Sequence, residues 1–86
     1  MIKGKLESGF EYEIDEAILG DWKMLKLLRG IDKGNASLIV DVVDMLFGDD
    51  VDKLEAHLEK DGKLTVEAMV EAVTEIFEQH TETKNS

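Results

Sequence analysis

The side chains that could carry acid–base, nucleophilic or metal chemistry are few and scattered in this sequence. It contains no Cys, which removes thiol nucleophiles and thiolate metal ligands. The two histidines, His57 and His80, fall in separate predicted helices, without the short spacing between ligands that is typical of zinc sites. Carboxylates are numerous, but none lies in an apolar run that would desolvate it and raise its pKa. We therefore expect a protein that is not an enzyme and that needs neither metal nor cofactor.

Asp61-Gly62 resembles the middle of a calcium-binding loop, but the flanking residues do not fit that motif. With Gly62 at the sixth position of the loop, His57 takes the first position and Ala68 the twelfth. Both positions require oxygen ligands, and the twelfth supplies a bidentate carboxylate. The pair therefore predicts a turn and not a calcium site.

The charge of the chain narrows the classes of partner. The 86 residues carry a formal net charge of −10, and residues 34–86 hold four Lys/Arg against thirteen Asp/Glu. The electrostatic field of this negative charge repels phosphate groups, so nucleic acid and anionic membranes are disfavoured as partners and a basic protein is favoured. No stretch has the length and apolarity of a signal peptide or a membrane span, which predicts a cytoplasmic protein.

A β-hairpin is expected at the N-terminus. Residues 2–6 and 10–14 alternate apolar and polar side chains, and Gly9 stands where a three-residue loop needs a positive φ. The apolar set should share one face, with Lys3 and Lys5 opposite Glu11 and Glu13 on the other. A lone hairpin is marginal in water, so its apolar face should pack on helices.

Helical periodicity and capping residues predict the rest of the chain. Asp15 should cap a turn over residues 16–19, and after Gly20 a second cap, Asp21, should start a helix that ends near Ile31. In total, helices are expected over about residues 16–31, 36–47, 50–60 and 66–79, with further caps at Asn35, at Asp49 or Asp50, and at Thr65. The predicted class is α+β, a small N-terminal hairpin packed on about four α-helices. Residues 1–80 should form a single compact domain and residues 81–86 a flexible polar tail.

Two helix faces of opposite charge are candidate interaction surfaces. The helix within 16–31 groups Lys23, Lys26 and Arg29 away from its apolar stripe. The last helix has an acidic stripe at helical spacing, Glu67, Glu71, Glu75, Glu78 and Glu82, which also fits an ordinary solvated face. We hypothesise that the basic face meets the acidic one, either within one chain or between copies as self-association.

The order and spacing of several segments resemble one known family. These segments are the hairpin ending "FEYEID", then "LGDWKMLKLLRGIDKGN", then "VVDMLFGDDVDKLEAHLEKDGKLTVEAMVEAVTEIFE", and the terminal "KNS". Together they resemble the small tail assembly chaperones of long-tailed bacteriophages. The resemblance implies a protein of the host cytoplasm that binds the hydrophobic, helix-rich tape measure protein and keeps it soluble. It also implies help for major tail tube protein subunits as they polymerise around the tape measure protein, and absence from the mature virion.

Such a role requires exposed apolar side chains on a charged body. Trp22, Leu27, Met45, Phe47 and Phe77 are the candidates. The resemblance also implies a longer product made by a programmed −1 frameshift. Thr83-Lys84-Asn85 can be encoded by a slippery run of A followed by A-A-C or A-A-T, which makes this segment a candidate trace of recoding.

Two alternatives remain open at the level of sequence. Ser37 before Leu38, at the start of an apolar helix, is similar to the modified serine of small acidic acyl carrier proteins, although Ala36 stands where their motif has Asp. An unchanged intact mass after treatment with a phosphopantetheinyl transferase and coenzyme A would exclude that carrier or adaptor function. The other alternative is a host-takeover protein that binds a basic host factor.

Overall fold

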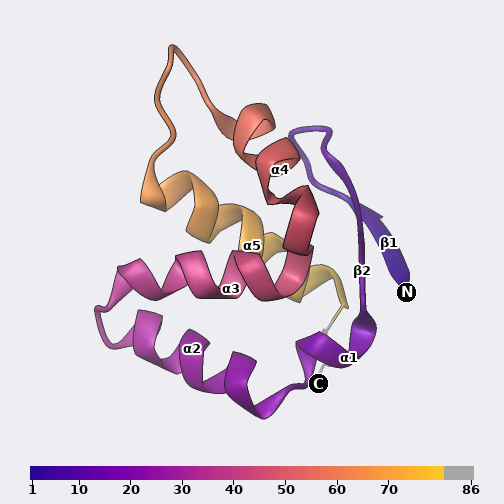
Figure 1. The fold of residues 1–86 in the computed structure, drawn as a ribbon, viewed down its shortest axis with the longest axis vertical. Coiled ribbons are helices and arrows are strands. Elements are labelled where there is room, and N and C mark those ends of the chain that lie inside the picture. Colours follow the sequence, from indigo (N-terminus) through magenta and orange to yellow (C-terminus); the bar gives the residue numbers. More distant parts are fainter. Residues whose placement is uncertain (81–86) are drawn as a thin grey trace.

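The computed structural model describes residues 1–80, which form a two-stranded hairpin followed by helices (Figure 1). This arrangement confirms the predicted α+β class. The strands are β1 (Ile2–Lys5) and β2 (Glu11–Ile14), and the α-helices are α1 (Glu16–Leu19), α2 (Trp22–Asp32), α3 (Ile39–Phe47), α4 (Val51–Leu58) and α5 (Val66–His80). Short 3₁₀ turns, Ala36–Leu38 and Gly48–Asp50, precede α3 and α4. The tail predicted over residues 81–86, which includes Thr83, Lys84 and Asn85, lies outside the described residues.

The hairpin has the predicted register. Lys3 pairs with Glu13 and Lys5 with Glu11, so these charged residues share one face. Gly9 has a φ of 103°, and the loop is closed by a hydrogen bond of 2.9 Å from the Leu6 N–H to the Phe10 carbonyl. Leu6, Tyr12 and Ile14 on the opposite face are buried.

Three of the predicted helix caps form, and two do not. Asp15 accepts from the Ala17 N–H, Asp21 from the Lys23 N–H, and Thr65 from the Ala68 N–H. Asn35 and Asp50 make no capping bond, and Asp49, the other candidate for the cap of α4, lies inside a 3₁₀ turn, so these two predictions are wrong. Each lies next to or within a 3₁₀ turn. There, Asn35 Oδ1 accepts from the Ser37 hydroxyl, and Asp50 pairs instead with Lys53 at 3.5 Å.

Helix α4 ends at Leu58, two residues before the predicted end at about residue 60. Lys60 and Lys63 instead exchange two backbone hydrogen bonds of 2.8 and 2.9 Å around a tight turn. Asp61 and Gly62 supply positive φ angles of 54° and 76° at the turn, as a two-residue hairpin loop requires. Figure 1 shows this loop projecting beyond α4 and α5.

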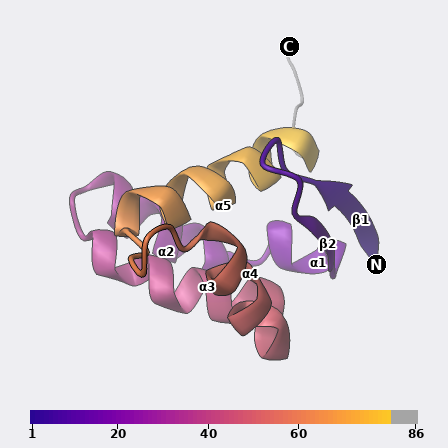
Figure 2. The ribbon, with the colours of Figure 1, turned by 90° about the horizontal axis from the view of Figure 1, so that it is seen from above.

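The core is built around α3, which contacts α2, α4 and α5 (Figure 2). Every helix from α2 to α5 and both parts of the hairpin contribute apolar side chains to it. Its buried members are Leu6, Tyr12, Ile14, Met24, Ile39, Val42, Val43, Leu46, Phe47, Leu54, Met69, Ala72, Val73 and Ile76.

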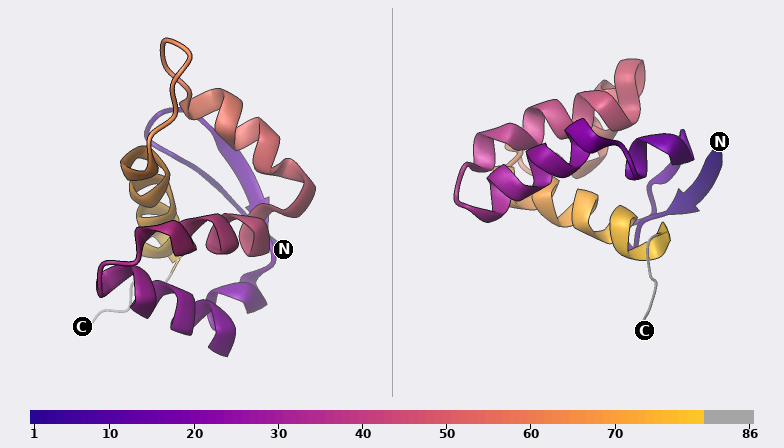
Figure 3. Two further views of the ribbon diagram at one scale, coloured as in Figure 1. Left: turned by 60° about the vertical axis from the view of Figure 1, so that its left-hand side comes forward. Right: turned by 90° about the horizontal axis from the view of Figure 1, so that it is seen from below.

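Polar contacts fasten the C-terminal end of α5 to the hairpin, and Figure 3 shows the two elements side by side. The Tyr12 hydroxyl donates to Gln79 Oε1 and lies 2.8 Å from His80 Nε2. Gln79 Nε2 donates to the Lys5 carbonyl at 3.0 Å. The last helix therefore supplies the packing partner that an isolated hairpin lacks.

Candidate functional site

The largest exposed apolar side chains of the helices gather at two places. Val40 on α3 and Val66 on α5 are 61% and 50% exposed, and Trp22 and Leu25 on α2 are 72% and 56% exposed. Aliphatic side chains scattered singly on a surface need no explanation, whereas neighbouring ones around a hollow mark contact sites. Val40 and Val66 border a hollow that is mainly apolar.

That hollow, called here the α3–α5 groove, lies between α3, α4 and the beginning of α5. Its volume is about 180 Å³. Buried Ile39, Val43 and Met69 belong to the core, and the half-buried or exposed aliphatic residues lie nearer the solvent. The lining residues are Ile39, Val40, Val43, Asp44, Val51, Glu55, Leu64, Thr65, Val66 and Met69. Its charged lining residues, Asp44 and Glu55, are both acidic.

Local sequence rules explain how the groove is made. Thr65 is the N-cap of α5, and Leu64 before it and Met69 after it occupy the two positions of a hydrophobic staple. A staple fixes the angle at which the chain enters a helix, which places Leu64 and Val66 at the groove. The Thr65 hydroxyl accepts from the Ala68 N–H, which satisfies one of the unpaired N–H groups at the start of α5.

The apolar candidates from the sequence do not form one surface. Trp22 is exposed as expected, whereas Leu27, Met45 and Phe77 are partly buried and pack against the core. Phe47 was expected among the exposed candidates, but it is only 8% exposed and packs edge-on against Phe10 with ring centroids 6.3 Å apart.

Sequence reasoning missed Val40, Val66 and Leu25 as surface residues. Each of the three lies on a helix whose apolar periodicity predicts an inward-facing side. Periodicity shows which residues share a helix face, but not where the neighbouring helices stop covering that face. The staple around Thr65 was the available signal for the groove.

The two charged faces remain apart within one chain. Lys23, Lys26 and Arg29 on α2 are exposed, as are Glu67, Glu71 and Glu78 on α5. Between residues 1 and 80 the ion pair that forms is Lys53–Asp50, and none joins α2 to α5. Leu28 and Ile31 of α2 line a hollow with Val73 and Phe77 of α5, so the apolar side of α2 faces the last helix. The intrachain form of the basic–acidic pairing is therefore wrong for the described residues.

Glu75 differs from the rest of the acidic stripe. Its side chain is half-buried, and Oε2 accepts from the Glu7 N–H at 2.7 Å and from Gln79 Nε2 at 3.2 Å. This residue was predicted as part of a docking face, but its carboxylate instead holds the hairpin loop. Burial, and secondarily the negative charge of Glu75, raise the pKa of Tyr12 above its usual value of 10.0.

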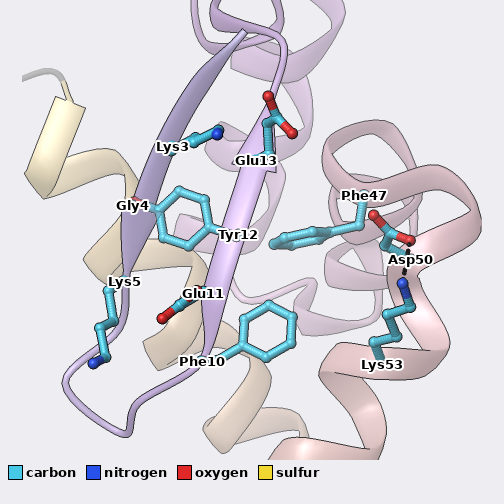
Figure 4. A pocket seen from close by; sticks show the side chains of 10 residues that line it. All are labelled: Lys3, Gly4, Lys5, Phe10, Glu11, Tyr12, Glu13, Phe47, Asp50 and Lys53. Carbon is cyan, nitrogen blue, oxygen red and sulfur yellow. Dashed lines mark ion pairs between the residues drawn. The ribbon is translucent and has the colours of Figure 1, made fainter.

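A wider hollow of about 580 Å³ lies beside the hairpin (Figure 4). Its lining includes the rings of Phe10 and Phe47 together with Lys3, Lys5 and Lys53. Three carboxylates, those of Glu11, Glu13 and Asp50, balance the three lysines. Because the charges cancel, this hollow has no clear preference for a charged ligand, in contrast to the α3–α5 groove.

Polar residues that could act on a ligand do not converge in the described part of the chain. Ser37 is exposed, and its hydroxyl donates to Asn35 at 2.9 Å. His57 contacts the Ser8 hydroxyl at 2.9 Å and lies against the Phe10 ring. Among residues 1–80 there is no group of three or more His, Asp or Glu placed to hold a metal ion.

Comparison of the chain with protein-family models, curated proteins and solved structures finds no match. None of the helices in the described residues has the length and apolarity needed to cross a membrane.

Proposed function

We propose that this protein is a tail assembly chaperone of a long-tailed bacteriophage. It binds the tape measure protein in the host cytoplasm, keeps it soluble and helps major tail tube protein subunits polymerise around it. It leaves before the particle is complete. In this proposal the protein acts by reversible binding and is not an enzyme.

The observation that supports the proposal is the exposed apolar α3–α5 groove on a body with a net charge of −10. An exposed apolar surface gives a chaperone its affinity for an insoluble client. A net charge far from zero keeps a protein and its complexes soluble. These two properties together are what a protein needs in order to hold a hydrophobic chain in solution.

Co-expression with a tape measure protein tests the proposal. The soluble fraction of the tape measure protein should rise when this chain is present, and the two should co-elute in gel filtration. An unrelated acidic protein of similar size serves as the control for a general effect of charge. A tape measure protein that stays insoluble with both would overturn the proposal.

Capture of partners from infected cells separates the proposal from host takeover. Recovery of tape measure or tube protein on the tagged chain supports the proposed function. Recovery of basic host proteins alone supports the alternative.

A further inference from the structure

We propose that the α3–α5 groove binds a single amphipathic α-helix that carries Lys or Arg beside its apolar face. The proposed function supplies only the identity of the protein from which this helix comes, the tape measure protein. The shape and charge of the groove carry the rest of the inference.

The size of the groove favours side chains of a helix over a small molecule. Pockets for small molecules typically enclose about 300–1,000 Å³, whereas this groove encloses about 180 Å³. Exposed Val40 and Val66 stand on two different helices at its border, with buried Val43 and Met69 also lining it. A partner helix can insert a few aliphatic side chains there, spaced three or four residues apart.

The groove also disfavours an extended partner. An added strand needs free backbone N–H and C=O groups along a sheet edge. The groove is built mainly from α3, α4 and α5, whose interior backbone groups are already hydrogen-bonded within the helices. Contact must therefore be made mainly by side chains, which is the mode in which an amphipathic helix binds.

Charge specifies the polar side of the partner. Asp44 on α3 and Glu55 on α4 line the groove, and both are exposed. Within residues 1–80, no Lys, Arg or His lines the groove. Carboxylates beside an apolar surface attract basic residues and repel acidic ones, so charge selects the partner and its orientation.

A synthetic amphipathic peptide of Leu and Lys at helical spacing is the first probe, added to the full-length protein and followed by NMR. Amide shifts should change around Val40, Asp44, Glu55 and Val66. A scrambled Leu/Lys peptide and a peptide with Glu in place of Lys should each bind roughly tenfold or more weakly. Equal binding of all three peptides, or shifts confined to α2, would overturn the inference.

Two double variants locate the contact. The double variant Val40→Ser, Val66→Ser should weaken peptide binding roughly tenfold or more. The double variant Trp22→Ser, Leu25→Ser removes exposed apolar groups from α2 instead, and should leave peptide binding unchanged. All four residues are at least half exposed, so both variants should fold, as urea unfolding can verify. Asp44→Lys with Glu55→Lys should transfer the preference from the Lys peptide to the Glu peptide. Unchanged peptide binding in the Val40/Val66 variant, or an unchanged preference for the Lys peptide in the Asp44/Glu55 variant, would contradict the inference.

The same variants in co-expression distinguish this inference from the proposed function. If the wild-type chain and the Val40/Val66 variant both solubilise the tape measure protein, the function stands and the groove is not its site. If only the Trp22/Leu25 variant fails to solubilise the tape measure protein, the client binds at α2 or depends on a second copy bound through α2. That result would also overturn the inference that the groove is the binding site. If the wild-type chain binds the basic peptide but does not solubilise the tape measure protein, the groove stands and the proposed function fails.

Discussion

The backbone N–H of Glu7 donates a hydrogen bond of 2.7 Å to Oε2 of Glu75, which joins the hairpin loop to the last helix across 68 positions of sequence. The same carboxylate accepts from Gln79, whose side chain also donates to the Lys5 carbonyl. One acidic side chain thus organises the junction between the beginning of the chain and α5. Its role is structural, although its sequence context is that of a solvated acidic stripe.

Glu75→Ala should lower the free energy of unfolding by about 1–2 kcal/mol, because it removes a charged acceptor and leaves the Glu7 N–H without its partner. Urea unfolding measures the change. Glu71→Ala is the matched control, since Glu71 is exposed one turn earlier and should change stability by no more than about 0.5 kcal/mol. Equal losses in the two variants would show that the contact with the hairpin contributes nothing.

Gly4→Ala should destabilise the protein by about 1–3 kcal/mol through overpacking. A Cβ at Gly4 would overlap the Tyr12 ring, which is buried and bonded to Gln79 and His80 and so cannot easily move away. Thermal and urea unfolding measure the loss. Gly20→Ala is the control, because a Cβ there meets nothing within 4 Å, and it should be neutral or slightly stabilising. A Gly4→Ala protein as stable as wild type would contradict this packing.

The phenol of Tyr12 should ionise above its usual pKa of 10.0 in the folded protein, because burial and the Glu75 carboxylate both disfavour the anion. Tyr12 is the only Tyr, so the absorbance of tyrosinate during an alkaline titration reports on it alone. The folded pKa is raised, so the stability from neutral Tyr12 is fully present below the unfolded pKa and is lost as pH rises through the folded value.

The Tyr12→Phe variant tests that linkage, since it cannot ionise. Its stability should fall less steeply above about pH 10 than that of the wild type. In Glu75→Gln the pKa of Tyr12 should decrease, because the nearby negative charge is gone. A wild-type phenol that titrates like free tyrosine would contradict the burial of this side chain.

Local rules in the sequence accounted for much of the fold. Alternation gave the register that pairs Lys3 with Glu13, and the caps Asp15, Asp21 and Thr65 each act within three residues of their own position. Asn35 and Asp50 departed from the rule because 3₁₀ turns there replace the extended geometry that a cap needs.

The candidate site depended on tertiary placement, which periodicity alone does not specify. Phe47 and Val40 lie on the same apolar helix, yet Phe47 is covered by the hairpin residue Phe10 while Val40 stays 61% exposed. Likewise, Glu75 differs from Glu71 only because the hairpin loop reaches it. Composition could indicate that some apolar surface would remain exposed on a chain this small, but not which helices would border it.

The exposed basic residues of α2 lead to a prediction about self-association. Lys23, Lys26 and Arg29 make no ion pair with α5 in the described part of the same chain, so the acidic stripe of another copy remains available to them. Sedimentation at low salt should therefore give a mass above the 9.7 kDa monomer. The mass should fall towards that of the monomer at high salt, because the screening length shrinks from about 10 Å at 0.1 M to about 3 Å at 1 M.

Charge-reversal variants test which basic residues make this contact. Lys26→Glu with Arg29→Glu should abolish the association. Lys60→Glu with Lys63→Glu changes the net charge equally but lies in the loop between α4 and α5, so this variant should still associate. A monomer at every salt concentration would rule out this pairing between copies.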